Sequence, residues 1–141
     1  MESAFQQFNQ IDGQIARTYH AAAVKFGLSD SELWVLYYLL VRGPGCLQAE
    51  LCHDTGLSRS TVNSTLKKLE KENVLCLSPG TGRNVCVSLT TAGAALAERT
   101  AGRLIALENE IYRSWSPEEQ ALLIRLNRDF AAKLSARVKK L

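Results

Sequence analysis

The sequence contains no apolar run long enough to cross a lipid bilayer. Its longest such stretch, from Leu33 to Val41, is far short of the roughly twenty residues that a membrane-spanning helix needs. The opening segment, MESAFQQFNQ, also lacks the basic and apolar regions of a secretion signal. We therefore expect a cytoplasmic protein with no membrane partner.

Patterns typical of catalysis are also scarce. The chain has two histidines, His20 and His53, but no glycine-rich phosphate loop, no HExxH motif and no nucleophile with a recognisable base nearby. Its four cysteines do not form the paired CxxC knuckles of a structural zinc site. We therefore expect no enzymatic activity, no cofactor and no bound metal.

A large excess of positive charge is missing as well. The 17 Lys and Arg residues are nearly balanced by 14 Asp and Glu residues, and the net charge at pH 7 is +3 with neutral histidines. Such a chain does not bind nucleic acid through its net charge alone, so its positive charge favours binding only where it is concentrated. That happens between Arg59 and Arg83, where basic residues outnumber Glu70 and Glu72.

What the sequence does contain is a pair of short helices joined by a tight turn, within residues 47–73. The first helix, Leu47 to Asp54, is followed by Gly56, which supplies the backbone freedom of a sharp turn. Ser58 is a suitable N-cap for a second helix that runs without Gly or Pro from Arg59 to Glu72. This pattern is typical of a helix-turn-helix, which places its second helix in the DNA major groove.

The two faces of the second helix differ in chemistry. Val62, Leu66 and Leu69 recur at spacings of four and three, so we expect them to share one face and to pack against a core. The other face is either an ordinary solvated surface or a DNA-binding surface. We favour DNA, because Arg, Asn, Ser and Thr at a helix start suit base edges and phosphates. The helix residues assigned to DNA are Ser58, Arg59, Ser60, Thr61, Asn63, Ser64, Lys67 and Lys68.

A β-hairpin is predicted directly after this helix. Asn73 is expected to end the helix in the left-handed conformation. Apolar and polar residues then alternate through residues 75–78 and 85–89, around the turn SPGTGR. Arg83 lies near the tip of this wing, where it is either a solvated turn residue or an arginine that enters the narrow, electronegative minor groove. We include Arg83 in the DNA-binding set.

Four segments together resemble the multiple antibiotic resistance regulator (MarR) family of winged-helix transcription regulators. They are LSDSELWVLYYL, the helix-turn-helix block, TGRNVCVSLTTAGAAL and SPEEQALLIRL, and their order and spacing span nearly the whole chain. The resemblance implies that Arg83 enters the minor groove and that the second motif helix meets the major groove. Two positions depart from the family, because Thr81 stands where an aspartate often supports the wing arginine, and Asn73 stands where Gly is usual.

We expect a mainly α fold with a small β-hairpin wing, in a single unit that spans residues 1–141. A winged helix-turn-helix occupies residues 30–90, and residues 1–28 and 91–141 form a helical dimerisation region. At 46% hydrophobic residues, a chain of this length can bury one core.

Three helices are predicted outside the DNA-binding block. They run from Glu2 to Lys25, from Thr91 toward Ser114, and onward from a capping box of Ser116 and Glu119. The last helix carries an apolar stripe formed by Leu122, Leu126, Phe130, Leu134 and Val138. The stripe packs either within the monomer or against a second copy. We favour a two-fold homodimer, because one recognition helix reads few bases and a symmetric dimer doubles the site. The resemblance implies the same, with these three helices intertwined between subunits.

Two cysteines suggest a possible redox pair. Cys76 and Cys86 lie on opposite strands of the predicted wing, equally far from a turn centre at Thr81, so a symmetric register would make them cross-strand neighbours. Their oxidation would stiffen the wing and change how Arg83 meets DNA. A reducing cytosol argues against a standing disulfide. Cys52 is interpreted as a core residue.

The sequence thus predicts a sequence-specific regulator of transcription that binds double-stranded DNA. We expect a repressor that acts as a homodimer on a pseudo-palindromic operator and is released by a small-molecule effector, which the resemblance implies is aromatic or phenolic. The alternatives are a thiol- or metal-responsive regulator of the same fold, and a winged-helix module that binds protein. The effector site stays unassigned. Trp34, Tyr37, Tyr38 and His20 are candidates to line a pocket, but each is equally consistent with plain core.

Overall fold

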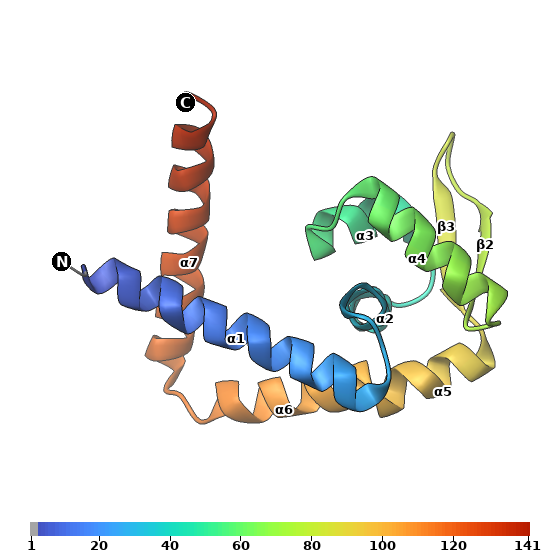
Figure 1. The fold of residues 1–141 in the computed structure, drawn as a ribbon, viewed down its shortest axis with the longest axis horizontal. Helices are drawn as coiled ribbons and strands as arrows, with labels where there is room; N and C mark the ends of the chain where they lie inside the picture. Colours follow the sequence, from blue (N-terminus) through green and yellow to red (C-terminus); the bar gives the residue numbers. More distant parts are fainter. Residues whose placement is uncertain (1–2) are drawn as a thin grey trace. The chain divides into compact units, whose positions relative to one another are not determined.

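The computed structural model describes residues 3–141, so the predicted helix start at Glu2 lies outside the described residues. The chain forms two compact units, of which the first ends at Ile105 and the second begins at Ala106. Figure 1 labels the elements in chain order, except for the short strand β1. They are α1 (Ala4–Phe26), α2 (Asp30–Arg42), β1 (Cys46–Leu47), α3 (Gln48–Thr55), α4 (Arg59–Lys71), β2 (Leu75–Pro79), β3 (Val85–Leu89), α5 (Thr91–Arg99), α6 (Ala101–Arg113) and α7 (Pro117–Val138). The predicted class, mainly α with a small β wing, is confirmed.

Local side-chain caps begin α4 and α7 where the sequence predicts. Ser58 precedes α4, and its Oγ accepts the Thr61 backbone N–H at 3.1 Å. Ser116 precedes α7 in a full capping box, because its Oγ accepts the Glu119 backbone N–H at 3.1 Å while the Glu119 carboxylate accepts the Ser116 N–H at 2.8 Å. Each cap satisfies backbone donors that the first helical turn leaves free. Asn73 has φ of 60°, so the predicted left-handed helix end is also confirmed.

The core of the first unit forms around α2, which contacts α1, α3, α4, α5 and β3. The predicted packing face of α4 is confirmed, since Val62, Leu66 and Leu69 are fully buried. Cys52 is half-buried and packs at the edge of this core. These contacts hold α4 by its apolar face and leave its polar face open to solvent.

The sheet has three antiparallel strands in the order β1, β3, β2. The hairpin of β2 and β3 is the predicted wing, and it lies beside α4 (Figure 1). The third strand, β1, was not predicted from the sequence. It has two residues and pairs Cys46 with Val87 and Leu47 with Cys86. A strand this short has no alternation from which to predict it.

The predicted pairing of Cys76 with Cys86 is wrong. In the observed register Cys76 lies opposite Ser88, and Cys86 lies opposite Ser78. The hairpin is therefore centred on Gly82 rather than Thr81, because Pro79 pairs with Val85 across a loop of residues 80–84. A shift of one residue in the turn centre moves each cross-strand partner by two. The two cysteines are diagonal neighbours, at a Cα separation of about 7–8 Å in such sheets, which is long for a disulfide.

The helix predicted from Thr91 toward Ser114 is divided in two at Thr100. The backbone of Thr100 has φ of −118° and ψ of −88°, outside the helical region. Its Oγ1 donates a hydrogen bond to the Leu96 carbonyl at 2.7 Å, and its own carbonyl accepts from the Leu104 N–H at 3.2 Å. A β-branched residue that bonds back to the preceding turn competes with helix continuation. Thr100 thus ends α5 and begins α6.

Large apolar side chains remain exposed on the outer helices. On α1 they include Phe5, Phe8, Ile11 and Ile15, on α6 they are Leu107 and Ile111, and on α7 they include Leu122, Leu126, Leu134 and Val138. The exposed fractions of Leu122, Leu126 and Leu134 lie between 46% and 49%. Among the described helices, none is both long enough and apolar enough to span a membrane.

Candidate nucleic-acid interface

The turn between α3 and α4 sets the direction of the recognition helix. Gly56 adopts φ of 69°, as the predicted sharp turn requires. The Thr55 hydroxyl donates to the Leu51 carbonyl at 2.7 Å and accepts the Leu57 N–H at 3.2 Å, while Leu57 packs against the core. Ser58 then caps α4. The turn is therefore held by hydrogen bonds on one side and by apolar packing on the other.

The start of α4 and the wing line one open groove with a volume of about 580 Å³. The groove brings together Arg59, Ser60 and Asn63 from α4 with Arg83 from the wing, all of them predicted from the sequence. Two arginines on one concave surface concentrate positive potential there. The other lining residues are not marked by any motif in the sequence; they are Gln48, Ala49, Cys52, Asn84 and Val85.

The predicted DNA-binding side chains differ in whether other groups of the protein already hydrogen-bond to them. Arg59, Asn63, Lys67 and Arg83 are exposed, and within residues 3–141 no hydrogen bond or ion pair occupies their side chains. The hydroxyls at the helix start mostly bond one another or the backbone. Ser58 Oγ donates to Thr61 Oγ1 at 2.8 Å and lies 3.2 Å from Ser60 Oγ, while Ser64 Oγ donates to the Ser60 carbonyl at 3.0 Å.

Arg83 lies in a loop of residues 80–84 whose backbone conformation is fixed by hydrogen bonds. The Gly80 N–H donates to the Asn84 carbonyl at 2.8 Å, and both the backbone N–H and the side-chain Nδ2 of Asn84 donate to the Thr81 carbonyl, at 3.2 and 2.9 Å. Gly82 supplies the left-handed backbone at the tip, with φ of 65°. Thr81 contributes its carbonyl rather than a carboxylate. The loop is therefore shaped by Asn84 instead of by an aspartate at position 81.

Lys68 was also predicted to face DNA, but it contacts another helix. Its Nζ lies 3.1 Å from Glu32 Oε1 on α2 and 3.9 Å from Glu72 Oε1. The Glu32 side chain is only 7% exposed. Burial raises the pKa of Glu32, but hydrogen bonds from Ser29 and Lys68 oppose burial and hold this pKa below its usual range. The same hydrogen bond raises the pKa of Lys68, so the pair is ionised at neutral pH.

Comparison with known families identifies the winged helix. The model of the MarR family matches residues 26–84, which include α2, α3, α4 and the hairpin as far as its tip. This segment belongs to the MarR family. The family resemblance predicted from the sequence is confirmed, and the family is one of transcription regulators rather than enzymes.

Solved structures show that the MarR-like fold extends over nearly the whole chain. A MarR-family regulator from Neisseria meningitidis covers 97% of this chain and 96% of its own, with a TM-score of 0.79 at 17% identity. The S. aureus MepR–DNA complex covers 95% and 99%, with a TM-score of 0.71 at 18% identity. Bordetella bronchiseptica BpsR, described as regulated in DNA binding by 6-hydroxynicotinic acid, covers 92% and 94%, with a TM-score of 0.68 at 18% identity. Among curated proteins no similar sequence was found.

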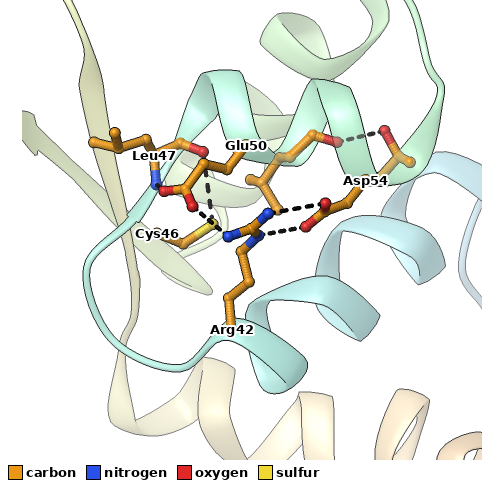
Figure 2. Close-up of polar contacts among 7 residues, drawn as sticks. Arg42, Cys46, Leu47, Glu50 and Asp54 are labelled. Atoms are coloured by element: carbon orange, nitrogen blue, oxygen red, sulfur yellow. Dashed lines mark hydrogen bonds and ion pairs between the residues drawn. The ribbon is translucent and has the colours of Figure 1, made fainter.

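A second charged cluster ties the MarR-family helices α2 and α3 together (Figure 2). Arg42, at the end of α2, donates hydrogen bonds to Glu50 and to both carboxylate oxygens of Asp54, the Nη2–Oδ1 distance being 3.0 Å. The hydrogen bond from Arg42 lowers the pKa of Asp54. Burial raises the pKa of the neighbouring Cys46 thiol to about 11, so Cys46 is a neutral thiol at neutral pH. The cluster holds α3, and with it the turn that directs α4.

The Arg42–Asp54 contact is expected to make the stability of the winged helix sensitive to acid. Because the folded pKa of Asp54 lies below its unfolded value of about 3.9, the contribution is present above that value and is lost as pH falls through the folded pKa. Urea unfolding of the wild type and of Asp54→Asn from pH 7 down to pH 3 measures this effect. We expect the variant to be less stable at pH 7 and the difference to shrink in acid. A difference that is constant with pH would contradict the assignment.

Proposed function

We propose that this protein is a sequence-specific regulator of transcription that binds double-stranded DNA as a homodimer. The observation that carries the proposal is the groove that places Arg59 and Asn63 of α4 beside Arg83 of the wing. A helix carrying exposed Asn and Arg suits base edges in the major groove, and an arginine on a hairpin suits the minor groove. The MarR-family match and the fold shared with the MepR–DNA complex support this proposal.

The homodimer is proposed from the exposed apolar residues of the outer helices. Phe5, Ile11 and Ile15 on α1 are between 45% and 56% exposed, and the α7 residues described above are similarly exposed. Apolar side chains at this density on one helix face mark an interaction surface. A two-fold dimer would cover these residues and present two α4 helices to the halves of a pseudo-palindromic operator.

The proposed mode of control is repression that is relieved by a small aromatic effector. An effector weakens DNA binding only if it binds better to the dimer conformation that does not fit the half-site spacing. The reported regulation of BpsR by 6-hydroxynicotinic acid supports an effector of this class. A half-buried aromatic cluster joins α1 to α2, with ring centroids of Trp34 at 4.9 Å from Tyr19 and 5.3 Å from Tyr37.

Fluorescence anisotropy tests the proposal directly. The reduced full-length protein is titrated onto a duplex from its own upstream region and onto a scrambled duplex of equal length, at several salt concentrations. We expect preference for the native duplex, with saturation at two chains per site. If the protein binds both duplexes equally weakly, genomic fragments are selected for binding to it. Failure to form a two-chain complex on any selected fragment would favour a winged-helix module that binds protein.

Two substitutions separate the electrostatic contact of the wing from the base contact of α4 within the proposed interface. Arg83→Ala is expected to weaken binding to operator and random DNA and to reduce the salt dependence, by about 0.9 in the slope of log K against log salt for each phosphate that is no longer neutralised. Asn63→Ala is expected to weaken operator binding about 5- to 100-fold while binding to random DNA changes little. Equal reductions on both duplexes for Asn63→Ala would refute its role in reading bases.

A further inference from the structure

The N-terminal turn of α2 makes two polar contacts with the recognition helix. Glu32 accepts the Ser29 backbone N–H at 3.0 Å as part of the α2 capping box, and the same Oε1 atom lies 3.1 Å from Lys68 Nζ. One residue earlier, the Ser31 hydroxyl is hydrogen-bonded to Thr65 Oγ1 at 3.0 Å. Thr65 and Lys68 lie one turn apart on the same side of α4, at the edge of its buried apolar face.

These contacts restrain α4 in a way that apolar packing does not. Leu66 and Leu69 tolerate small rotations of the helix, because dispersion and hydrophobic contacts have weak directional preference. A hydrogen-bonded ion pair to a carboxylate that is only 7% exposed depends on distance and angle. A rotation that breaks it leaves the Glu32 carboxylate buried without its cation, which is unfavourable. Together with the Thr65–Ser31 hydrogen bond, the contact favours the rotations of α4 at which Lys68 reaches Glu32.

We propose that Lys68 is a positioning residue, which through Glu32 fixes the rotation of α4 at which Asn63 meets base edges, and that Lys68 does not itself bind a phosphate. This inference rests on the proposed function and assigns Lys68 a role different from that predicted by its basic surface position. The rotation matters because Asn63 must align with a base edge, whereas a flexible lysine that contacts phosphate tolerates small shifts.

Lys67 provides a matched control on the same helix turn. It is the same residue type, it is exposed, and within the described residues its ammonium has no ion-pair partner. Lys67→Met and Lys68→Met therefore remove the same charge from adjacent positions. If both lysines bind phosphates, the two variants behave alike. If Lys68 acts through Glu32, they differ in salt dependence, in base discrimination and in their response to a change at Glu32.

The experiment combines Lys68→Met with Glu32→Gln. Glutamine retains the oxygen that accepts the Ser29 N–H, so the α2 capping box survives, but it removes the buried negative charge. We expect Lys68→Met to lower operator affinity about tenfold, to reduce discrimination against random DNA and to leave the salt slope unchanged. The double variant is expected to recover most of the affinity and most of the discrimination. Lys67→Met is expected to lower the salt slope by about 0.9 and to be unaffected by Glu32→Gln.

Two results would overturn the positioning role. One is a salt slope for Lys68→Met that falls as far as the slope for Lys67→Met. The other is a loss of operator affinity in Lys68→Met that the addition of Glu32→Gln does not restore.

Urea unfolding of the four Glu32 and Lys68 combinations gives a readout that does not depend on DNA. We expect Lys68→Met to lower the urea midpoint by about 1 M, and the double variant to regain much of this. Additive changes in the urea midpoint would show that the two side chains are not coupled. If the two side chains are coupled in stability but the wild-type protein binds no DNA, only the proposed function is overturned.

Discussion

Replacement of Gly93 by alanine is expected to destabilise the winged helix by about 3 kcal/mol or more. Gly93 is buried in the first turn of α5, and a Cβ added to it would lie 1.6 Å from the Val74 carbonyl oxygen and 2.6 Å from the Val74 carbonyl carbon. Side-chain rotation cannot relieve a clash between a Cβ and backbone atoms. The start of α5 and the start of the wing must therefore move apart.

This close approach lies at the junction between the wing and α5. The Val74 carbonyl accepts the Thr90 N–H at 3.0 Å. The Thr90 hydroxyl donates to the Asn73 carbonyl at 2.7 Å and lies 3.1 Å from the Val74 oxygen, and Thr90 Oγ1 accepts the Gly93 N–H at 2.9 Å as the cap of α5. Moving α5 would break these bonds together and leave a buried carbonyl unsatisfied. We therefore expect Gly93→Ala to misplace the wing as well as to lower stability.

Urea unfolding monitored by circular dichroism measures the effect of Gly93→Ala, with Gly13→Ala as the matched control. Gly13 lies within α1, and a Cβ there would meet only Arg17 Nη1, at an ordinary contact distance of 3.5 Å. Alanine has the higher helix propensity, so the control is expected to be neutral or to gain up to about 1 kcal/mol. A Gly93→Ala variant as stable as the wild type would show that α5 packs elsewhere.

Disruption of the exposed apolar face of α7 is expected to abolish dimerisation and to lower operator affinity by about 100-fold or more. Removal of the chain from Leu122 onward should leave a monomer or an insoluble protein. Because truncation removes other contacts too, Leu126→Glu combined with Leu134→Glu is the sharper test. These side chains are 49% and 47% exposed, so a monomer accommodates the charges, but a dimer would bury them without partners.

Ala132→Glu is the matched control for this pair. Ala132 is an exposed residue of α7 that lies two positions from both Phe130 and Leu134, and therefore on the opposite side of the helix from the apolar stripe. Sedimentation equilibrium reports the mass, and anisotropy reports operator affinity. We expect the control to remain a dimer with wild-type affinity. A tight dimer formed by the Leu126→Glu, Leu134→Glu variant would exclude α7 from the interface.

The residues of the candidate interface were predictable to different degrees. Arg59, Asn63 and Arg83 follow from a helix start after a Ser cap and from the tip of a hairpin, which are both marked by local residues. Gln48 and Asn84 line the same groove, but nothing in the sequence distinguishes them from ordinary helix and turn residues. Lys68 shows the opposite case, because its position on α4 predicts a DNA contact while the structure pairs it with Glu32.

In the wing, a one-residue difference in the turn centre changes all the cross-strand pairs. The alternation of residues 75–78 and 85–89 determines which side chains share a face, and Leu75 and Val87 are buried. The register depends on the turn centre, which several adjacent Gly and Pro residues leave ambiguous. Hydrogen bonds between Gly80, Thr81 and Asn84 place this centre at Gly82 and move Cys76 opposite Ser88.

Residue order alone was sufficient to predict the starts of α4 and α7, the left-handed Asn73, the packing face of α4 and the alternation of the wing. These features rest on hydrogen bonds and periodicities that act within about four residues of the chain. The strand register, the break at Thr100, the groove shared by α4 and the wing, and the partners of Arg42 and Lys68 became visible only in the folded chain. Glu32 and Lys68 are 36 residues apart, and contacts over such separations exist only after the helices have packed.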